Sequence, residues 1–229
     1  MKIAIMDFDG TLNDGKNPKL FFKYMFKEKM IPKKTLLKGL KIYSDLIRKK
    51  VSYDKTHELY GILWAEEMKA FEQKFIKEKA KKLFPELKKH IYPSTYELID
   101  LLKEKGYYII IMSTSPQELI DLVVKELKVD EGIGFQLEVK NGKYTGKIAN
   151  EIFKLTGKKK LIKKLKASKK YDWKKSIIAG DSIHEAEIFP EAEISIALNP
   201  QSDVKKLAKE KGWLILNKRN IVEKLKELL

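Results

Sequence analysis

The hydrophobic positions of this chain follow two different periods. Residues 2–8 form a short, almost wholly apolar run that ends in acidic residues, the pattern of a buried strand in a parallel sheet. From residue 13 to about residue 92, apolar residues recur at helical spacing, as in Leu36, Leu40 and Tyr43. Glycine and proline are scarce in this segment, which therefore predicts a helical block without a strand.

Beyond residue 92 the pattern alternates between strands and helices. Pro93-Ser94 predicts a helix start, with Ser94 as N-cap, Glu97 completing a capping box and Gly106 ending the helix. Further elements are expected as a strand at 107–112, a helix at 116–127, a hairpin over 135–148 that turns at Asn141-Gly142, a helix near 159–167, strands at 176–179, 194–197 and 214–216, and a helix from residue 220.

Alternating strands and helices form a parallel sheet with right-handed crossovers. We therefore expect an α/β fold with a three-layer, Rossmann-like core made of residues 1–12 and 93–229. The helical block follows the first strand directly, so residues 13–92 are predicted to form an inserted, all-helical cap domain.

Charge and composition narrow the class of protein. The chain carries 48 Lys and Arg against 32 Asp and Glu, a formal charge of +16. The lysines are interleaved with glutamate along nearly every segment, which favours solvated helix faces over a nucleic-acid-binding surface. Richness in Lys, Glu and Ile without cysteine is typical of proteins from very hot environments.

No apolar run approaches the ~18 residues of a membrane span. The first strand begins at residue 2, so no signal peptide is expected before it. These features predict a cytoplasmic protein with no membrane partner.

Two acids follow the first strand, in Asp7-Phe8-Asp9-Gly10-Thr11. Ligands of open α/β sheets bind beyond the carboxyl ends of the strands, and residues two apart in extended chain point the same way. Asp7 and Asp9 can therefore face one site. Buried acids repel each other unless a cation lies between them, and hard oxygen ligands suit Mg²⁺. The alternative is an acidic turn that only caps the strand.

Two more strand ends carry polar residues. Asp181 and Glu185 follow the apolar run 176–179 and supply further carboxylates for a metal site. Ser113 ends the strand 107–112, and Ser113, Thr114 and Ser115 precede a predicted helix. Hydroxyls and amides at a helix N-terminus suit a phosphate group, although Ser115 could instead serve only as an N-cap.

A lysine near the start of the helix at 159–167 would neutralise such a group of anions. We choose Lys160 for its position at the predicted helix start, with Lys158 and Lys159 as alternatives. His57 and His90 lie on lysine-rich helical segments and are expected at the surface, whereas His184 lies within the Asp181 motif.

Taken in order, these motifs resemble the four motifs of the haloacid dehalogenase superfamily of hydrolases. The segment 113–118 and the hairpin at 141–146 resemble its phosphoserine-phosphatase-like branch, family IB. The insertion after the first strand is similar to that of members with a helical cap of type C1.

The resemblance implies a Mg²⁺-dependent phosphatase that hydrolyses a small phosphorylated metabolite, a phosphomonoester, through an aspartyl phosphate. It implies that Asp7 is the nucleophile and Asp9 the general acid and base. It assigns the phosphate to Ser113 and Lys160, helped by Gly10, Thr11, Thr114 and Ser182. It assigns the metal to Asp7, the backbone carbonyl of Asp9 and Asp181, with Glu185 acting directly or through water.

Two other functions remain open at this point. A phosphomutase or phosphotransferase uses the same two acids, and a basic nucleic-acid-binding protein on a retired hydrolase scaffold would explain the charge. The helical block lacks the residue pattern with which phosphoserine phosphatases hold the amino acid, so the resemblance does not name the substrate.

Overall fold

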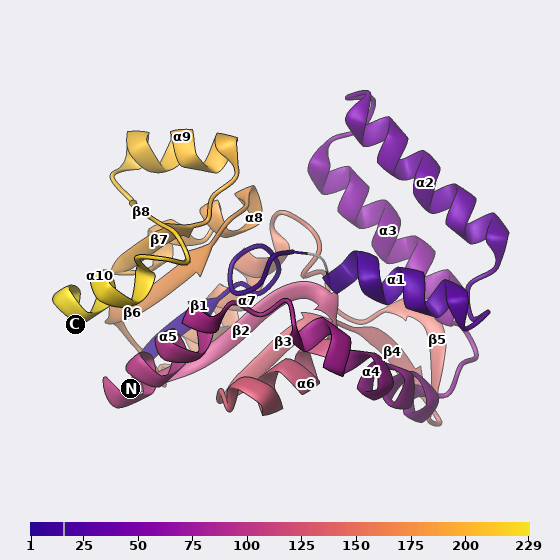
Figure 1. The fold of residues 1–229 in the computed structure, drawn as a ribbon, viewed down its shortest axis with the longest axis horizontal. Coiled ribbons are helices and arrows are strands. Elements are labelled where there is room, and N and C mark those ends of the chain that lie inside the picture. The colour runs from indigo at the N-terminus through magenta and orange to yellow at the C-terminus, as the bar shows by residue number, and fades with distance from the viewer. Residues whose placement is uncertain (16) are drawn as a thin grey trace.

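The computed structural model describes residues 1–15 and 17–229, and the side chains of all of these except residues 17–19, 53 and 54. A parallel sheet of six strands, in the order β3-β2-β1-β6-β7-β8, lies at the centre of the larger part of the molecule (Figure 1). The strands are Lys2–Met6 (β1), Tyr107–Pro116 (β2), Glu131–Phe135 (β3), Asp172–Gly180 (β6), Ile194–Leu198 (β7) and Leu214–Leu216 (β8). This order confirms the predicted Rossmann-like core.

Both faces of the sheet are buried, which explains the continuous apolar runs of its strands. In β1, Ile3 and Ile5 belong to the core on one face, while Ala4 and Met6 belong to the core on the other. Helices α5 (Pro93–Glu104), α6 (Gln117–Leu127) and α10 (Ile221–Leu228) pack on the second face. Helices α7 (Gly157–Ala167), α8 (Ile183–Ala186) and α9 (Ser202–Lys211) contribute to the first.

The predicted helical block forms four helices on one side of the sheet (Figure 1). They are Asn17–Lys27 (α1), Lys33–Ile47 (α2), Tyr53–Met68 (α3) and Gln73–Lys88 (α4). The chain enters and leaves this block side by side, because Asn13 and Ile91 form an antiparallel bridge and the Asp14 amide donates to the His90 carbonyl at 3.2 Å. The division into two domains at this point stays a prediction. No helix in residues 1–15 and 17–229 is long and apolar enough to cross a membrane.

A β-hairpin ties the block to the core. Its strands are Leu137–Lys140 (β4) and Lys143–Ile148 (β5), and the turn residues Asn141 and Gly142 both have positive φ, 51° and 75°. The predicted Asn-Gly turn is thereby confirmed. Tyr144 of β5 exchanges backbone hydrogen bonds with Ala70 and Phe71, between α3 and α4, at 2.9 and 3.0 Å.

Several elements differ from the sequence prediction. Strand β3 was missed because Gly132 and Gly134 weaken the strand signal; a Cβ on Gly132 would lie 2.5 Å from Val124 of α6, so the close packing of that helix requires glycine. Helices α8 and α9 were also missed. Tyr92, not Ser94, is the N-cap of α5, since Pro93 occupies the first helical position, where its missing N–H costs nothing.

Candidate active site

Three adjacent strands bring predicted site residues to one edge of the sheet. Asp7 follows β1 directly, Ser113 lies on β2, and Asp181 follows β6. Since β1 pairs in parallel with both β2 and β6, these three residues share the carboxyl edge of the sheet.

The carboxylates of Asp7, Asp181 and Glu185 form one buried cluster, with ligand oxygens all within 4.8 Å of one another. The Thr11 hydroxyl lies 3.1 Å from Asp7 Oδ2 and 3.1 Å from Asp181 Oδ1, and so links the two motifs. Gly10 has φ +88°, and a Cβ there would lie 2.6 Å from Asp181 Oδ2. The glycine after Asp9 therefore makes room for the second acid.

The cation of the site is Lys158, and the choice of Lys160 was wrong. Lys158 Nζ lies 2.7 Å from Asp7 Oδ1 and 2.8 Å from the Met112 carbonyl, and it also pairs with Glu185. The Lys158 side chain is 1% exposed, whereas that of Lys160 is 62% exposed and pairs with Glu151. Helix α7 begins at residue 157, two residues before its predicted start, so the inward-facing lysine comes two positions earlier.

Glu185 is held from both of its oxygens. The Ser182 amide donates to Glu185 Oε2 at 3.1 Å, which is one half of a capping box on α8. Ser182 Oγ donates to the same oxygen at 2.6 Å, while Oε1 faces Lys158. A Cβ on Gly180 would lie 1.9 Å from Glu185 Cγ, so glycine is required at the end of β6. In the structure the Ser182 hydroxyl is hydrogen-bonded to Glu185. The predicted contact of Ser182 with a phosphate stays a prediction.

Asp9 occupies a separate polar pocket beside the cluster. Its Oδ2 accepts from Ser113 Oγ at 3.1 Å and from Ser115 Oγ at 2.6 Å, and its Oδ1 accepts from Asn13 Nδ2 at 3.2 Å. Asp9 was predicted to bind the metal through its backbone carbonyl and not through its side chain. That contact stays a prediction. Asn13 was not predicted to belong to the site, and Ser115 was predicted there only as part of a phosphate-binding helix start or as an N-cap. Spacing offered a signal for Ser115, which is two residues from Ser113 on one strand and so faces the same side.

The remaining predicted residues are placed as follows. Thr114 is half-buried on β2 between two buried serines, and strand alternation turns it away from Asp9. His57 of α3 is half-buried and packs against the buried His184, with ring centroids 5.4 Å apart, so its expected surface position was wrong. His90 is also half-buried, with Nδ1 3.0 Å from Asp14 Oδ2.

Two side chains that the sequence did not single out complete the site. Gln201 Nε2 donates to Asp181 Oδ2 at 3.1 Å, and Asn199 Nδ2 donates to the Thr11 carbonyl at 3.1 Å. Both residues lie in the connection between β7 and α9. No local sequence motif predicts these two residues, because only the order of the strands in the sheet brings them to the site.

Burial dominates the electrostatics of the site. It raises the pKa of Asp7 well above the ordinary value against the opposing charge of Lys158, and it raises the pKa of Asp9. Burial and the neighbouring Glu185 raise the pKa of Asp181 to about 6. The pKa of Glu185 is lowered, because the Lys158 ammonium outweighs the effect of burial. Three carboxylates facing one ammonium leave the cluster short of positive charge, which is the condition that a divalent cation relieves.

The sequence of this chain is similar to those of known hydrolases and phosphatases. A family model for haloacid dehalogenase-like hydrolases matches residues 4–184. The phosphoserine phosphatase of Methanocaldococcus jannaschii is 24% identical over 229 residues, covering 98% of this chain and 96% of that one. Phosphoserine phosphatase SerB1 of Mycobacterium tuberculosis is 26% identical over 125 residues, and the match spans only 41% of its length.

Solved structures share the fold. A protein described as having unknown function, from Bordetella pertussis, superposes with a TM-score of 0.79 at 15% identity, covering 95% of this chain and 98% of that one. A phosphoserine phosphatase carrying a phospho-aspartyl intermediate analogue superposes with a TM-score of 0.67 at 20% identity, covering 100% and 98%.

Proposed function

Because the chain belongs to the haloacid dehalogenase-like hydrolase family, we propose that it is a Mg²⁺-dependent phosphatase that hydrolyses a small phosphomonoester through an aspartyl phosphate on Asp7. The observation that carries the proposal is the setting of Asp7. Its carboxylate lies 2.7 Å from the Lys158 ammonium and within 4.8 Å of the Asp181 and Glu185 carboxylates, while Asp9 sits beside it in a separate pocket.

The donor set fits magnesium. Carboxylate and carbonyl oxygens are its usual protein ligands. In this proposal Asp7, Asp181 and the Asp9 backbone carbonyl would hold the ion, and Glu185 would act directly or through water. When bound, Mg²⁺ supplies positive charge that neutralises the carboxylates and the phosphoryl oxygens.

The first half-reaction needs a nucleophile and an acid. A carboxylate oxygen of Asp7 attacks phosphorus, the bond from phosphorus to the ester oxygen breaks, and that oxygen takes the proton of Asp9. The raised pKa of Asp9 supports this role, because burial keeps the proton available nearer to neutral pH. Lys158 stabilises the charge on the transferring phosphoryl group from a fixed position.

The second half-reaction returns the site to its starting state. Asp9, now a carboxylate, takes a proton from water as the water oxygen attacks phosphorus. The bond from phosphorus to the Asp7 oxygen breaks, and inorganic phosphate leaves. The hydrogen bonds from Ser113, Ser115 and Asn13 hold the Asp9 carboxyl in place through both proton transfers.

Relatives named as phosphoserine phosphatases support a small phosphomonoester as substrate. The test is a panel of phosphorylated metabolites, O-phosphoserine included, assayed for inorganic phosphate with Mg²⁺ and again with EDTA. Release of phosphate that stops with EDTA is expected. Transfer of the phosphate to another position on the substrate, without release, would contradict hydrolysis.

The matched variants for this panel are Asp7→Asn and Asp100→Asn. The amide at residue 7 is nearly isosteric but a poor nucleophile, so we expect less than about 1% of the wild-type rate, a barrier increase of roughly 3 kcal/mol or more. Asp100 is exposed on α5 and its substitution should leave the rate unchanged. Equal rates for the two variants would remove Asp7 from the mechanism.

A further inference from the structure

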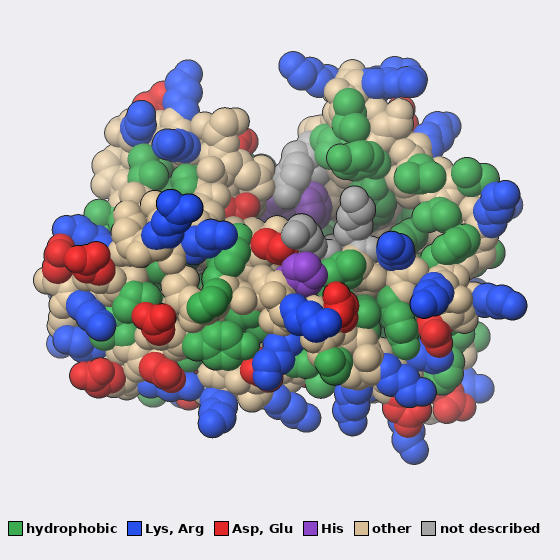
Figure 2. Space-filling view, viewed as in Figure 1, with side chains coloured by type: hydrophobic (Ala, Val, Ile, Leu, Met, Phe, Trp, Pro, Cys, Tyr) green, Lys and Arg blue, Asp and Glu red, His purple; other side chains and the backbone are tan. Residues whose placement is uncertain are grey.

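The outermost helix of the cap side, α2, exposes a line of large apolar side chains. Leu37, Leu40, Tyr43 and Ile47 are 57%, 56%, 55% and 64% exposed. Residues 40, 43 and 47 follow the spacing of one helix face, with Leu37 one turn before Leu40. We call these four residues the α2 stripe. Figure 2 shows hydrophobic side chains gathered along the part of the surface where Figure 1 draws α2.

The stripe is additional to the face with which α2 packs on the rest of the protein. Thr35 and Gly39 are buried on that inner face, and Tyr60 of α3 donates to the Gly39 carbonyl at 3.0 Å. Thr35 also bonds to Glu67 of α3. Since α2 already has its partner in α3, the stripe is an apolar surface left over after folding.

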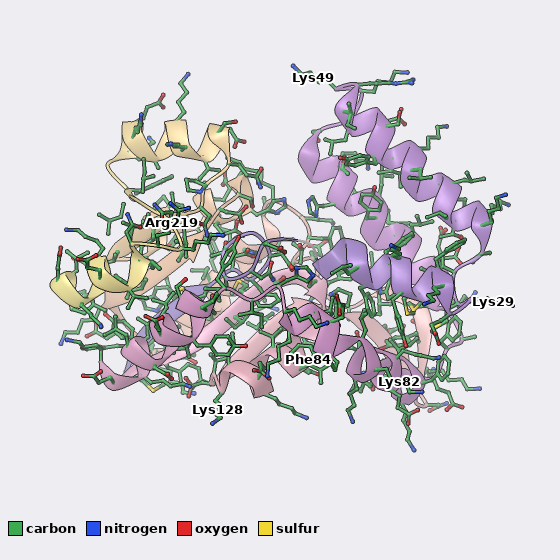
Figure 3. All side chains as sticks on the ribbon, in the orientation of Figure 1. Lys29, Lys49, Lys82, Phe84, Lys128 and Arg219 are labelled. Carbon is green, nitrogen blue, oxygen red and sulfur yellow. The ribbon has the colours of Figure 1, made fainter. Side chains whose placement is uncertain are left out.

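The charge around the stripe is strongly one-sided. Residues 27–50 hold nine Lys and Arg against two acids, an excess of seven positive charges. One of the two acids, Glu28, is paired with Lys79 of α4. Within the described part of the chain, the basic residues from 29 to 50 form no ion pair, and they project from the flank and both ends of α2, where Figure 3 labels Lys29 and Lys49.

We propose that α2 is a docking surface for an anionic lipid bilayer, lying in the plane of the headgroups with the stripe turned toward the acyl chains. An apolar face flanked by Lys and Arg is the combination that interfacial helices use, and the long basic side chains reach phosphate groups while their stems remain on apolar surface. The net charge of +16 adds attraction of the whole molecule to such a surface. The prediction that the protein has no membrane partner rested on the lack of a spanning segment, and this mode of binding needs none.

The charge favours a bilayer over a second copy of the chain. Two copies meeting through α2 would bring two segments of sevenfold positive excess together, and like charges across an interface oppose binding. The shape favours a bilayer over an acidic protein: the stripe is a convex ridge on one helix, and a bilayer surface accommodates a ridge without a matching groove.

The experiment is flotation of the whole protein with vesicles of phosphatidylglycerol and phosphatidylcholine, or of phosphatidylcholine alone. We expect binding to the anionic vesicles only, weakened as salt rises. Substituting all four stripe residues by serine, or Lys34, Lys38 and Lys41 by glutamate, should lower the bound fraction at least tenfold. Because these residues are exposed, both variants should keep the melting temperature and the p-nitrophenyl phosphate turnover of wild type.

The control variant replaces Lys205, Lys206 and Lys209 by glutamate, three exposed lysines of helix α9, which holds four lysines as α2 does. It changes the net charge as much as the α2 charge variant does and should bind nearly as wild type does. Failure of wild type to bind anionic vesicles would overturn the proposal. Equal loss of vesicle binding in the two charge variants would also overturn it, because binding would then depend only on the net charge. A dimer that the serine variant converts to monomer, without vesicle binding, would assign the stripe to a second copy.

Discussion

A buried ammonium group is costly unless carboxylates surround it, and Lys158 meets two. Burial alone would lower its pKa, but Asp7 and Glu185 raise it, so Lys158 keeps its charge. Its place against Asp7 makes it the side chain best positioned to meet the transferring phosphoryl group.

We therefore predict that Lys158→Gln lowers kcat by roughly 100-fold or more, the cost of losing a charged group at a developing anion. Lys160→Gln should stay within about twofold of wild type, because Lys160 only pairs with Glu151 at the surface. Steady-state kinetics on p-nitrophenyl phosphate, with circular dichroism to check folding, measure both. If Lys158→Gln left kcat unchanged and Lys160→Gln lowered it, the roles assigned to the two lysines would be reversed.

In the proposed site, Asp181 would make magnesium binding sensitive to pH. Its pKa of about 6 means that in the metal-free protein it holds a proton below that pH, and only the carboxylate binds a cation. The apparent affinity for Mg²⁺ should therefore be constant above about pH 7 and fall by up to about tenfold per unit below pH 6. Isothermal titration calorimetry across pH 5–8 gives the profile.

The raised pKa of Asp181 also makes the stability of the fold depend on pH. A carboxyl whose folded pKa lies above its unfolded value stabilises the fold below the unfolded pKa, and loses that contribution as pH rises through 6. Gln201→Leu removes a hydrogen bond that lowers this pKa, so its affinity profile should shift to higher pH. A flat profile in both proteins would show that Asp181 does not titrate in this range.

Asp7 and Asp181 were predictable from the sequence because each directly follows an apolar strand, and the ends of parallel strands converge at one edge of the sheet. Lys158 was not, since three lysines in a row differ only in helix phase, and a helix start is uncertain by one or two residues. Gln201 and His57 have no local pattern at all. They reach the site through topology and through the packing of α3, which one-dimensional spacing does not contain.

Glycine has opposite effects in two of the helices. Gly157 begins α7, and a Cβ there would lie 1.9 Å from the Glu151 carbonyl oxygen. Gly39 lies inside α2, where a Cβ would meet its nearest neighbour at an ordinary 3.7 Å. The first position excludes a side chain and the second tolerates one.

Gly157→Ala should therefore destabilise the protein by about 1–3 kcal/mol and, by displacing the start of α7, lower activity through Lys158. Gly39→Ala should stabilise it by about 0.5–1 kcal/mol with activity unchanged. Urea unfolding followed by circular dichroism compares the two. Equal effects would mean that backbone entropy, and not the close contact at residue 157, decides both.

Two kinds of element were predicted correctly: long amphipathic helices, and strands with clear turn signals at their ends. Their patterns repeat often enough to be distinct. Strand β3 has five residues, two of them glycine, and depends on packing under α6 that only the fold reveals. Ser94 looked like an N-cap, but Pro93 fixes the helix start two positions earlier, with Tyr92 as the N-cap.

Between the two parts of the molecule, His57 of α3 meets His184 beside Glu185. This contact links the helical block to the carboxyl edge of the sheet. We predict that His57→Ala raises KM for the best phosphomonoester of the panel about tenfold, since the loss falls on the part of the substrate beyond the phosphate. Its turnover of p-nitrophenyl phosphate should change less than twofold.

Lys55→Ala is the matched control for His57→Ala. Lys55 lies half a turn away on α3 and its side chain is 51% exposed. It should leave both substrates unaffected. If His57→Ala instead slows both substrates equally, the histidine supports the chemistry and does not discriminate between substrates.

The central place of β1 has a consequence for the order in which the molecule assembles. β1 is made first, yet its two neighbours, β2 and β6, follow about 100 and 170 residues later along the chain. During synthesis the strand that leads to Asp7 stays unpaired and apolar, while the helices of residues 17–88 can already form the contacts among themselves, such as that of α2 with α3. The core can close around β1 only after the ribosome has passed residue 179, so the segment exposed longest to misassembly is the one that leads to the proposed nucleophile.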